Sequence, residues 1–186
     1  EIASCLVGSE MCIRDRRYFP VVDEEGRLLN KFITVRNGGK EFLDVVAHGN
    51  ERVLRARLSD AEFFFNEDRK LKLEDRLEKL KTVSFQEGLG NMYDKSERLA
   101  KLAEMVKFAI NVKVDDTNLK RTALLSKTDL VAGMVVEFTE LQGVMGREYA
   151  KLDGEPAEVA EGIYEHYLPR FAGDELPKGT IGRIVL

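Results

Sequence analysis

The order of residue patterns along the chain predicts an α+β fold. Residues 17–35 contain two short runs of apolar and β-branched side chains, a pattern typical of strands. After residue 50, apolar side chains recur every three or four positions, a pattern typical of helices. Because the strands come first and only helices follow, we expect the end of an α/β domain, a connecting helix and then an all-α domain.

The predicted strands are Tyr18–Val22, an edge strand because of its proline, and Leu28–Val35. A polar turn ending in Gly26 joins them into a hairpin. The first helical pattern begins at Asn50, a candidate N-cap, and runs to Phe65, whereas His48 is interpreted as a loop residue. We expect at least two of the three phenylalanines at 63–65 to pack in a core or a domain interface rather than to stack on bases.

Further helices are predicted along the rest of the chain. One carries Leu73 and Leu80, and a glycine-containing loop at 85–90 follows it. The others cover 99–110, a segment for which Asp115-Asp116-Thr117 offers a cap, and the stretches 138–149 and 156–167. The expected domains are therefore 17–66, a connecting helix at 67–85, and a truncated helical domain at 86–186.

Composition limits the classes of function. The 186 residues are 44% hydrophobic and 33% charged, with a formal net charge of −4. This balance argues against a general polyanion binder, although a local basic patch can still contact RNA. The sequence has no apolar run of membrane-spanning length and no signal peptide, so we expect no membrane association and a cytoplasmic location.

The first sixteen residues look foreign to the rest. The stretch from Leu6 to Asp15 is similar to the in-frame translation of a transposase adapter used to prepare sequencing libraries, and Arg16 fits its last codon. A short disordered tail is the alternative. We therefore exclude residues 1–16 from fold reasoning as non-native, together with Cys5 and Cys12, and expect both native ends to lie elsewhere.

A series of blocks, in order, resembles the β subunit of the bacterial two-subunit glycyl-tRNA synthetase. Their order and spacing carry the resemblance more than any single block. The blocks are YFPVV at 18–22, KFITVRN at 31–37, GNERVLRARLSDAEFF at 49–64, LKTVSFQEGLGNMYD at 80–94, KTDLV at 127–131, EFTELQGVMG at 137–146 and EHYLPRFAGDELP at 165–177.

The resemblance implies a fragment of the tRNA-recognising subunit of a glycine-tRNA ligase. Residues 17–66 would end a B3/B4-like domain, and 86–186 would form an HD-like helical domain. The partners would be the α subunit, in an α2β2 assembly, and tRNA(Gly). ATP and Mg²⁺ would bind at the α subunit and no cofactor in this chain, which would itself be non-catalytic.

A working HD domain is a metal-dependent phosphohydrolase, which needs several His and Asp ligands to activate water. The resemblance places Lys95 and Thr128 where histidine ligands would stand, followed by Asp129. His166 is the remaining candidate ligand. We interpret these four positions as a degenerate site without metal, and Asp129 and His166 as surface or structural residues.

Two basic clusters are candidates for tRNA binding. Arg52 and Arg55 are three residues apart on one predicted helix and share a face, although acidic neighbours are available as ion-pair partners. The second cluster, near the domain junction, comprises Arg69, Lys70 and Lys72. The sequence is therefore compatible with three hypotheses: a tRNA-positioning module, an HD-type phosphohydrolase, and an interaction protein with no tRNA role.

Overall fold

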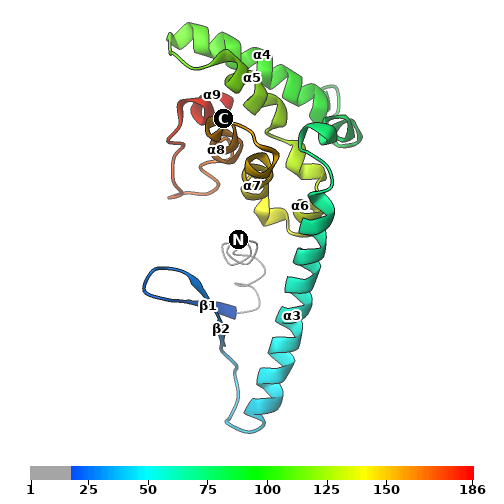
Figure 1. Ribbon diagram of the computed structural model, residues 1–186, viewed down its shortest axis with the longest axis vertical. Helices are drawn as coiled ribbons and strands as arrows, with labels where there is room; N and C mark the ends of the chain where they lie inside the picture. Colours follow the sequence, from blue (N-terminus) through cyan, green and yellow to red (C-terminus); the bar gives the residue numbers. More distant parts are fainter. Residues whose placement is uncertain (1–17) are drawn as a thin grey trace. The chain divides into compact units, whose positions relative to one another are not determined.

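The computed structural model describes residues 18–186, so the adapter-like stretch 1–16 lies outside the described part. The chain divides into two compact units, Glu1–Glu67 and Asp68–Leu186. In the described residues, the first unit holds a β-hairpin and most of a long helix, and the second is mainly helical (Figure 1). The predicted α+β class is thus confirmed. Within residues 18–186, none of the helices has the length and apolar content needed to cross a membrane.

The hairpin forms as the sequence predicts. Strands β1 (Tyr18–Val22) and β2 (Leu28–Thr34) pair antiparallel. The Asp23 carboxylate organises the turn, because it accepts a hydrogen bond from the amide of Arg27 at 2.8 Å. Gly26 adopts a φ of 77°, a left-handed conformation that glycine takes without steric cost.

The long helix starts earlier than predicted. Helix α3 spans Leu43–Asp68, so the assignments of Asn50 as N-cap and of His48 as a loop residue are wrong. Asn50 lies inside the helix, where its side-chain amide donates to the carbonyl of Val46 at 2.8 Å and accepts from the hydroxyl of Tyr18 at 2.8 Å. A residue whose polar groups are satisfied in this way does not have to end a helix.

The three adjacent phenylalanines of α3 differ in exposure. Phe64 and Phe65 are partly buried, whereas Phe63 is 59% exposed. Phe63 and Phe64 meet edge to face, with ring centroids 5.4 Å apart. The pattern agrees with packing of two of the three rings.

A buried ion pair lies where the chain leaves α3. The guanidinium of Arg76, which is only 3% exposed, donates to the Asp68 carboxylate at 3.3 Å and to the carbonyls of Asp68 and Leu71 at 2.6 and 2.7 Å. The range 67–85, for which the sequence predicts a connecting helix, instead holds the end of α3 and a 3-10 helix, η1 (Glu74–Thr82). Arg76 binds carbonyls that a continuing α-helix would have used.

Asp68 also connects the end of α3 to the rest of the second unit. Its carboxylate accepts from the amides of Gly133 and Met134, at 2.8 and 2.9 Å, at the start of helix α6 (Gly133–Glu137). A third donor is the Tyr149 hydroxyl at 2.9 Å. One buried carboxylate thus satisfies donors from two segments that are at least 65 positions away in sequence, in addition to Arg76.

Helix α4 (Met92–Ile110) begins with a capping box. The Asn91 side chain accepts from the amide of Asp94, and the Asp94 side chain accepts from the amide of Asn91, both at 3.0 Å. The segment before it, predicted as a loop, forms a small hairpin of β3 (Ser84–Gln86) and β4 (Gly90–Asn91).

Helix α5 (Asp116–Leu125) is capped by Asp115, as predicted, because the Asp115 carboxylate accepts from the amide of Asn118 at 2.8 Å. It packs along α4, and the two helices lie side by side in Figure 1. Helix α9 (Thr180–Val185) packs against both. These three helices form a hydrophobic cluster of Ala100, Ala103, Leu119, Ala123, Ile181 and Val185.

The predicted continuous helix at 138–149 is wrong. The chain forms a short 3-10 helix, η3 (Thr139–Leu141), and then helix α7 (Val144–Asp153). They are separated at Gly143, whose φ is 79° and where a Cβ would lie 2.5 Å from the ring of Tyr167. The close approach and the left-handed conformation both require glycine there.

Helix α8 (Ala157–Glu165) follows Gly154, which ends α7 in the left-handed conformation and so separates the two helices as predicted. Pro156 is the N-cap of α8 and lies just outside the first turn. Helix α8 packs closely on α5 and α9, because Gly162 brings its backbone near both. A Cβ on Gly162 would lie 2.7 Å from Cγ2 of Thr122 and 3.1 Å from Cγ2 of Ile181.

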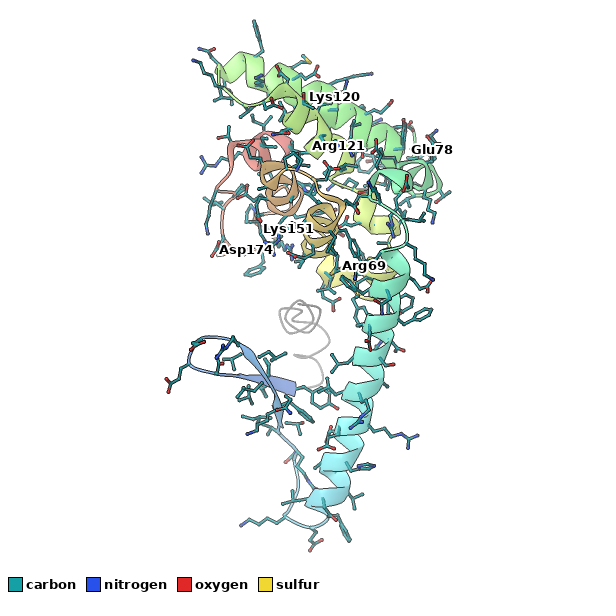
Figure 2. The ribbon with its side chains drawn as sticks, viewed as in Figure 1. Arg69, Glu78, Lys120, Arg121, Lys151 and Asp174 are labelled. Atoms are coloured by element: carbon teal, nitrogen blue, oxygen red, sulfur yellow. The ribbon has the colours of Figure 1, made fainter. Side chains whose placement is uncertain are left out.

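An ion-pair network joins the outer parts of the second unit. Arg121 of α5, labelled in Figure 2, contacts Glu155 in the loop between α7 and α8 at 2.6 Å. It also contacts Glu74 of η1 at 3.0 Å. The Arg121–Glu155 contact is bidentate, the geometry that gives guanidinium–carboxylate pairs their directional strength.

Candidate functional sites

The four positions of the predicted degenerate HD-like site all lie in the second unit. Thr128 and Asp129 belong to a 3-10 helix, η2 (Thr128–Val131), and both are fully buried. The Thr128 hydroxyl donates to the carbonyl of Leu125 at 2.7 Å. The hydroxyl hydrogen of Thr128 is therefore used in a bond to the last residue of α5, and Thr128 has a structural role at this position.

Asp129 caps helix α7. One carboxylate oxygen, Oδ2, accepts from the amide of Gly143 at 2.6 Å, and the amide of Gly146 also stabilises the ionised carboxylate. Gly143 precedes the first residue of α7, so the negative charge lies at the positive end of the helix dipole. Burial raises the pKa of Asp129 to about 6, and these amides oppose that shift. The other oxygen, Oδ1, is buried and has no hydrogen-bond partner in residues 18–186.

His166 ends helix α8 and is only 5% exposed. Its Nδ1 lies 2.7 Å from the carbonyl of Ile163, which can only accept a hydrogen bond, so Nδ1 carries the proton. Nε2 is then a bare acceptor, and it lies 2.8 Å from Nζ of Lys127. Burial lowers the pKa of His166 to about 3, and the neighbouring Lys127 charge lowers it further.

The residue that binds His166 is Lys127, which the sequence analysis did not select as a site residue. Its Nζ donates to His166 Nε2 and lies 4.0 Å from the ring centroid of Tyr167. Lys95 of α4 is close enough for its charge to act on Lys127. Burial, then repulsion by Lys95, lowers the pKa of Lys127 to about 8, and Asp129 opposes the shift. Lys127 thus links three of the four predicted positions, Lys95, Asp129 and His166, whereas the Thr128 hydroxyl bonds to Leu125 instead.

This cluster does not have the chemistry of a metal site. Among residues 18–186, no group of three His, Cys, Asp or Glu side chains is placed to hold a metal ion. The available nitrogen of His166 faces an ammonium group, which repels cations. One oxygen of Asp129 is used to cap α7. In this cluster, cationic side chains are oriented instead by neutral partners.

The first tRNA-binding candidates, Arg52 and Arg55, lie on α3 in the first unit. Both are exposed, and their spacing of three residues places them on neighbouring positions of the helix surface. In the described part of the chain, no carboxylate forms an ion pair with either guanidinium, although Glu51 and Asp60 are close in sequence. Both groups are therefore available to a ligand.

The second set of candidates lies just after α3, in the second unit. Arg69, Lys70 and Lys72 are all exposed, and Arg69 is labelled at the end of the helix in Figure 2. Arg69 and Lys70 already interact with other groups of the chain. The amide of Lys72 donates to the Asp75 carboxylate at 3.1 Å. This segment is shaped by the turn around Arg76.

Two groups of functional interest were missed by sequence reasoning for different reasons. Lys127 stands two positions before Asp129, but its contact with His166 joins residues 39 positions apart. The Asp68 cluster joins residues that are up to 81 positions apart. In both cases the sequence shows a charged residue, Lys127 or Asp68, beside the end of a predicted helix. This signal does not identify the residue that the charged side chain contacts.

Comparison with known proteins identifies the family of this α+β chain. A family model described as the glycyl-tRNA synthetase beta subunit matches residues 6–186. The chain belongs to this family. The glycine–tRNA ligase beta subunits of Desulforamulus reducens and Syntrophotalea carbinolica are 53% and 57% identical to it over 171 residues, which is 91% of this chain. The corresponding protein of Clostridioides difficile is 56% identical over 167 residues.

The chain spans about a quarter of the length of these relatives, 25% for the first two and 24% for the third. The resemblance inferred from the ordered blocks is thereby confirmed at the level of the family. The adapter-like origin of residues 1–16 stays a prediction.

Proposed function

We propose that this chain is part of the tRNA-recognising subunit of a glycine-tRNA ligase and positions tRNA(Gly) for glycylation by a separate α subunit. The observation that carries the proposal is the identity of 53–57% to glycine–tRNA ligase beta subunits over about nine-tenths of the chain. In this proposal the subunits form an α2β2 assembly in the cytoplasm. ATP and Mg²⁺ act at the α subunit, and this chain is non-catalytic.

The proposal also assigns the two units. Residues 17–66 belong to the end of a B3/B4-like domain, and 86–186 to an HD-like helical domain. The polar cluster supports an HD-like domain without hydrolase activity, because Lys127 faces His166 and Asp129 caps a helix. A metal-dependent phosphohydrolase needs a site that holds a cation and a water molecule, and these contacts oppose both.

The predicted contacts to tRNA are electrostatic. Arg52 and Arg55 would bind phosphates of the tRNA backbone, with Arg69, Lys70 and Lys72 as further candidates. An exposed arginine can donate two hydrogen bonds to one phosphate, which fixes the position of the RNA without reading its sequence. The net charge of −4 confines this attraction to local patches.

The test compares two double variants in the intact α/β enzyme. Arg52→Gln with Arg55→Gln removes the candidate pair, and Arg98→Gln with Lys101→Gln removes two exposed charges at the same spacing on α4. We expect the first variant to weaken tRNA binding by about tenfold or more, since each phosphate contact adds to affinity and to its salt dependence.

Glycine-dependent ATP–pyrophosphate exchange, which needs no tRNA, should be unchanged in both variants. Equal tRNA affinity in the wild type and in the Arg52/Arg55 variant would remove this patch from the tRNA interface. If the intact enzyme neither bound tRNA(Gly) nor charged it with glycine, the proposed function itself would fail.

A further inference from the structure

Lys127 is partly exposed, and the groups in contact with its side-chain nitrogen are neutral. Nζ lies 2.8 Å from Nε2 of His166 and 4.0 Å from the centroid of the Tyr167 ring. In the described residues, no carboxylate lies within 4.0 Å of Nζ. The second unit also contains lysines that form ion pairs with glutamates at 2.7 to 3.2 Å, namely Lys81, Lys151 and Lys178. Lys127 therefore differs from these lysines in its partners.

The contact with His166 suits a neutral amine as well as an ammonium group. Nδ1 of His166 donates to the carbonyl of Ile163 at 2.7 Å, so Nε2 can only accept a hydrogen bond. A lysine amine that has lost one proton keeps two N–H groups, and one of them can still donate to Nε2 while the lone pair points elsewhere. A carboxylate partner would instead stabilise the charged form, which has no lone pair. His166 thus orients Nζ of Lys127 without holding it protonated.

The groups around Nζ also favour the neutral form of Lys127. Burial, then the charge of Lys95 on α4, lowers the pKa of Lys127 to about 8, and Asp129 on η2 opposes the shift. The two groups that follow α8 are uncharged at neutral pH, since burial lowers the pKa of His166 and raises that of Tyr167. A partly desolvated lysine near another cation is an activated nucleophile, because a larger share of its amine is neutral.

A second cation lies beside the Tyr167 ring and favours an anionic reagent. A Cβ on Gly143 would lie 2.5 Å from the Tyr167 ring and 3.4 Å from a terminal nitrogen of Arg170, so both border this glycine. The same nitrogen of Arg170 donates to the carbonyl of Gln142 at 3.0 Å. Among residues 18–186, no carboxylate forms an ion pair with this exposed guanidinium. The Tyr167 ring is therefore close to two cations, Lys127 and Arg170, that would attract an anion.

We propose that Lys127 is a site of acylation by acyl phosphates, the mixed anhydrides of a carboxylic acid and phosphoric acid. The lone pair of the neutral Nζ attacks the acyl carbon, and the C–N bond forms as the C–O bond to phosphate breaks. Phosphate leaves with the electrons of that bond and takes up the proton that the nitrogen loses. The N–H of the new amide can still donate to Nε2 of His166. This proposal does not rest on the proposed function.

The test measures acetylation of individual lysines in the intact α/β enzyme. Brief incubation with acetyl phosphate, followed by peptide mass spectrometry, gives a rate for each lysine. The internal control is Lys81, which lies 4.7 Å from the centroid of the Tyr93 ring but is paired with Glu78. At about pH 7.5 we expect Lys127 to react at least about fivefold faster than Lys81, because a larger share of its amine is neutral. Equal or slower acetylation of Lys127 would overturn the proposal.

The dependence of the rate on pH is a second measurement on the same samples. The rate at Lys127 should rise up to about pH 8 and then level off, because its amine is neutral above that pH. The rate at Lys81 should continue to rise beyond pH 10, because its hydrogen bond to Glu78 raises its pKa above 10.5. A rate at Lys127 that follows that of Lys81 over the whole range contradicts an activated amine.

Two arginine variants and a neutral reagent test the preference for an acyl phosphate. Arg170→Gln should slow acetylation of Lys127 by acetyl phosphate about threefold or more, but should leave its acetylation by the neutral N-hydroxysuccinimide ester of acetic acid unchanged. Arg147→Gln is the matched control, because both guanidiniums stack on Tyr164 but that of Arg147 is paired with Glu161. It should change neither rate. If Arg170→Gln affects both reagents equally, or neither, the assignment to acyl phosphates fails, whatever the outcome of the Arg52/Arg55 test.

Discussion

His166 and Asp129 show how burial sets the chemistry of single residues. Burial disfavours the charged form of each, so it lowers the pKa of His166 to about 3 and raises that of Asp129 to about 6. A neutral His166 can accept from Lys127, and an Asp129 carboxylate must be stabilised by helix amides. Neither residue is prepared to bind a cation, although both residue types are common metal ligands.

These two shifts act on stability in opposite directions. His166 has a folded pKa below its ordinary value of 6.5, so its contribution is fully present above pH 6.5 and is lost as the pH falls towards 3. Asp129 has a folded pKa above its ordinary value of 3.8, so its contribution is present below pH 3.8 and is lost as the pH rises through 6. Between pH 3.8 and 6 the two largely cancel.

A His166→Gln substitution separates the two effects. We expect the difference in unfolding free energy, wild type minus variant, to grow with pH at up to about 1.4 kcal/mol per unit between pH 3 and 6.5. Urea unfolding followed by circular dichroism at several pH values measures it. A difference that does not change with pH would show that the folded pKa of His166 is close to 6.5.

Sequence reasoning at the residue scale found most of the polar cluster but not its organisation. Lys95, Thr128, Asp129 and His166 were selected because of a family resemblance, and their assignment to a degenerate HD-like site stays a prediction. The central role of Lys127 was missed, because a lysine next to two buried residues reads as a surface charge. Its contact with His166 depends on how α5 and α8 pack.

At the scale of elements, helix α8 depends on one glycine. A Cβ on Gly162 would lie 2.7 Å from Cγ2 of Thr122, which is itself completely buried. Thr122 also bonds its hydroxyl to the carbonyl of Asn118 at 2.8 Å, so its rotamer cannot change freely. The packing of α5, α8 and α9 is therefore sensitive to a single methyl group.

We predict opposite effects of the same substitution at two helical glycines. Gly162→Ala should lower the unfolding free energy by about 1–3 kcal/mol, because it overpacks the contact of α8 with α5. Gly49→Ala on α3, where no atom lies within 4 Å of the added Cβ, should raise it by up to about 1 kcal/mol through helix propensity.

Chemical denaturation of the two variants and of wild type provides the comparison. Adding Thr122→Ser to Gly162→Ala removes the opposing methyl group and should restore part of the loss. If Gly162→Ala is as stable as wild type, the close packing of α8 does not limit stability.

Element boundaries were the weakest part of sequence reasoning, for identifiable reasons. The hairpin and the Asp115 cap were confirmed, because turn and cap residues act locally. The start of α3 was misplaced, since Asn50 is a frequent N-cap but here bonds to Val46 and Tyr18. The break at Gly143 was missed because it depends on close packing against the ring of Tyr167, which follows 24 positions later.

At the scale of the whole molecule, Asp68 holds together the start of the second unit. Its carboxylate satisfies two amides, a hydroxyl and the guanidinium of Arg76, all in the second unit. Removing one partner of a buried ion pair leaves an uncompensated charge, which costs far more than an exposed pair contributes. The boundary near residue 68 is thus a structural requirement and not only a composition change.

Two truncations test this requirement. A chain of residues 66–186 keeps Asp68 and should unfold cooperatively, whereas a chain of residues 70–186 lacks it and should be less stable by about 3–5 kcal/mol. Urea titration monitored by far-ultraviolet circular dichroism compares them. Arg76→Met in the shorter chain removes the orphaned charge and should recover part of the loss. Equal stability of the two chains would show that Asp68 is dispensable.

The family was accessible from sequence because ordered blocks are spread over almost all of residues 18–186. The relation to glycyl-tRNA synthetase beta subunits was then confirmed by comparison. The sequence predicted a connecting helix at 67–85, whereas almost all of this range lies inside the second unit, where the buried Arg76 organises the chain. Single charged residues that become buried are the main limit of pattern-based prediction in this chain.

The capping of α7 by Asp129 has a consequence for genetics. A substitution at this position removes the acceptor of the Gly143 amide and so lowers the amount of folded protein, and the resulting phenotype would resemble that of a lost catalytic group. Loss of any measured activity in an Asp129→Ala strain would therefore not identify an active site. The amount of folded protein in the cell, scored beside growth, distinguishes a missing helix cap from missing chemistry.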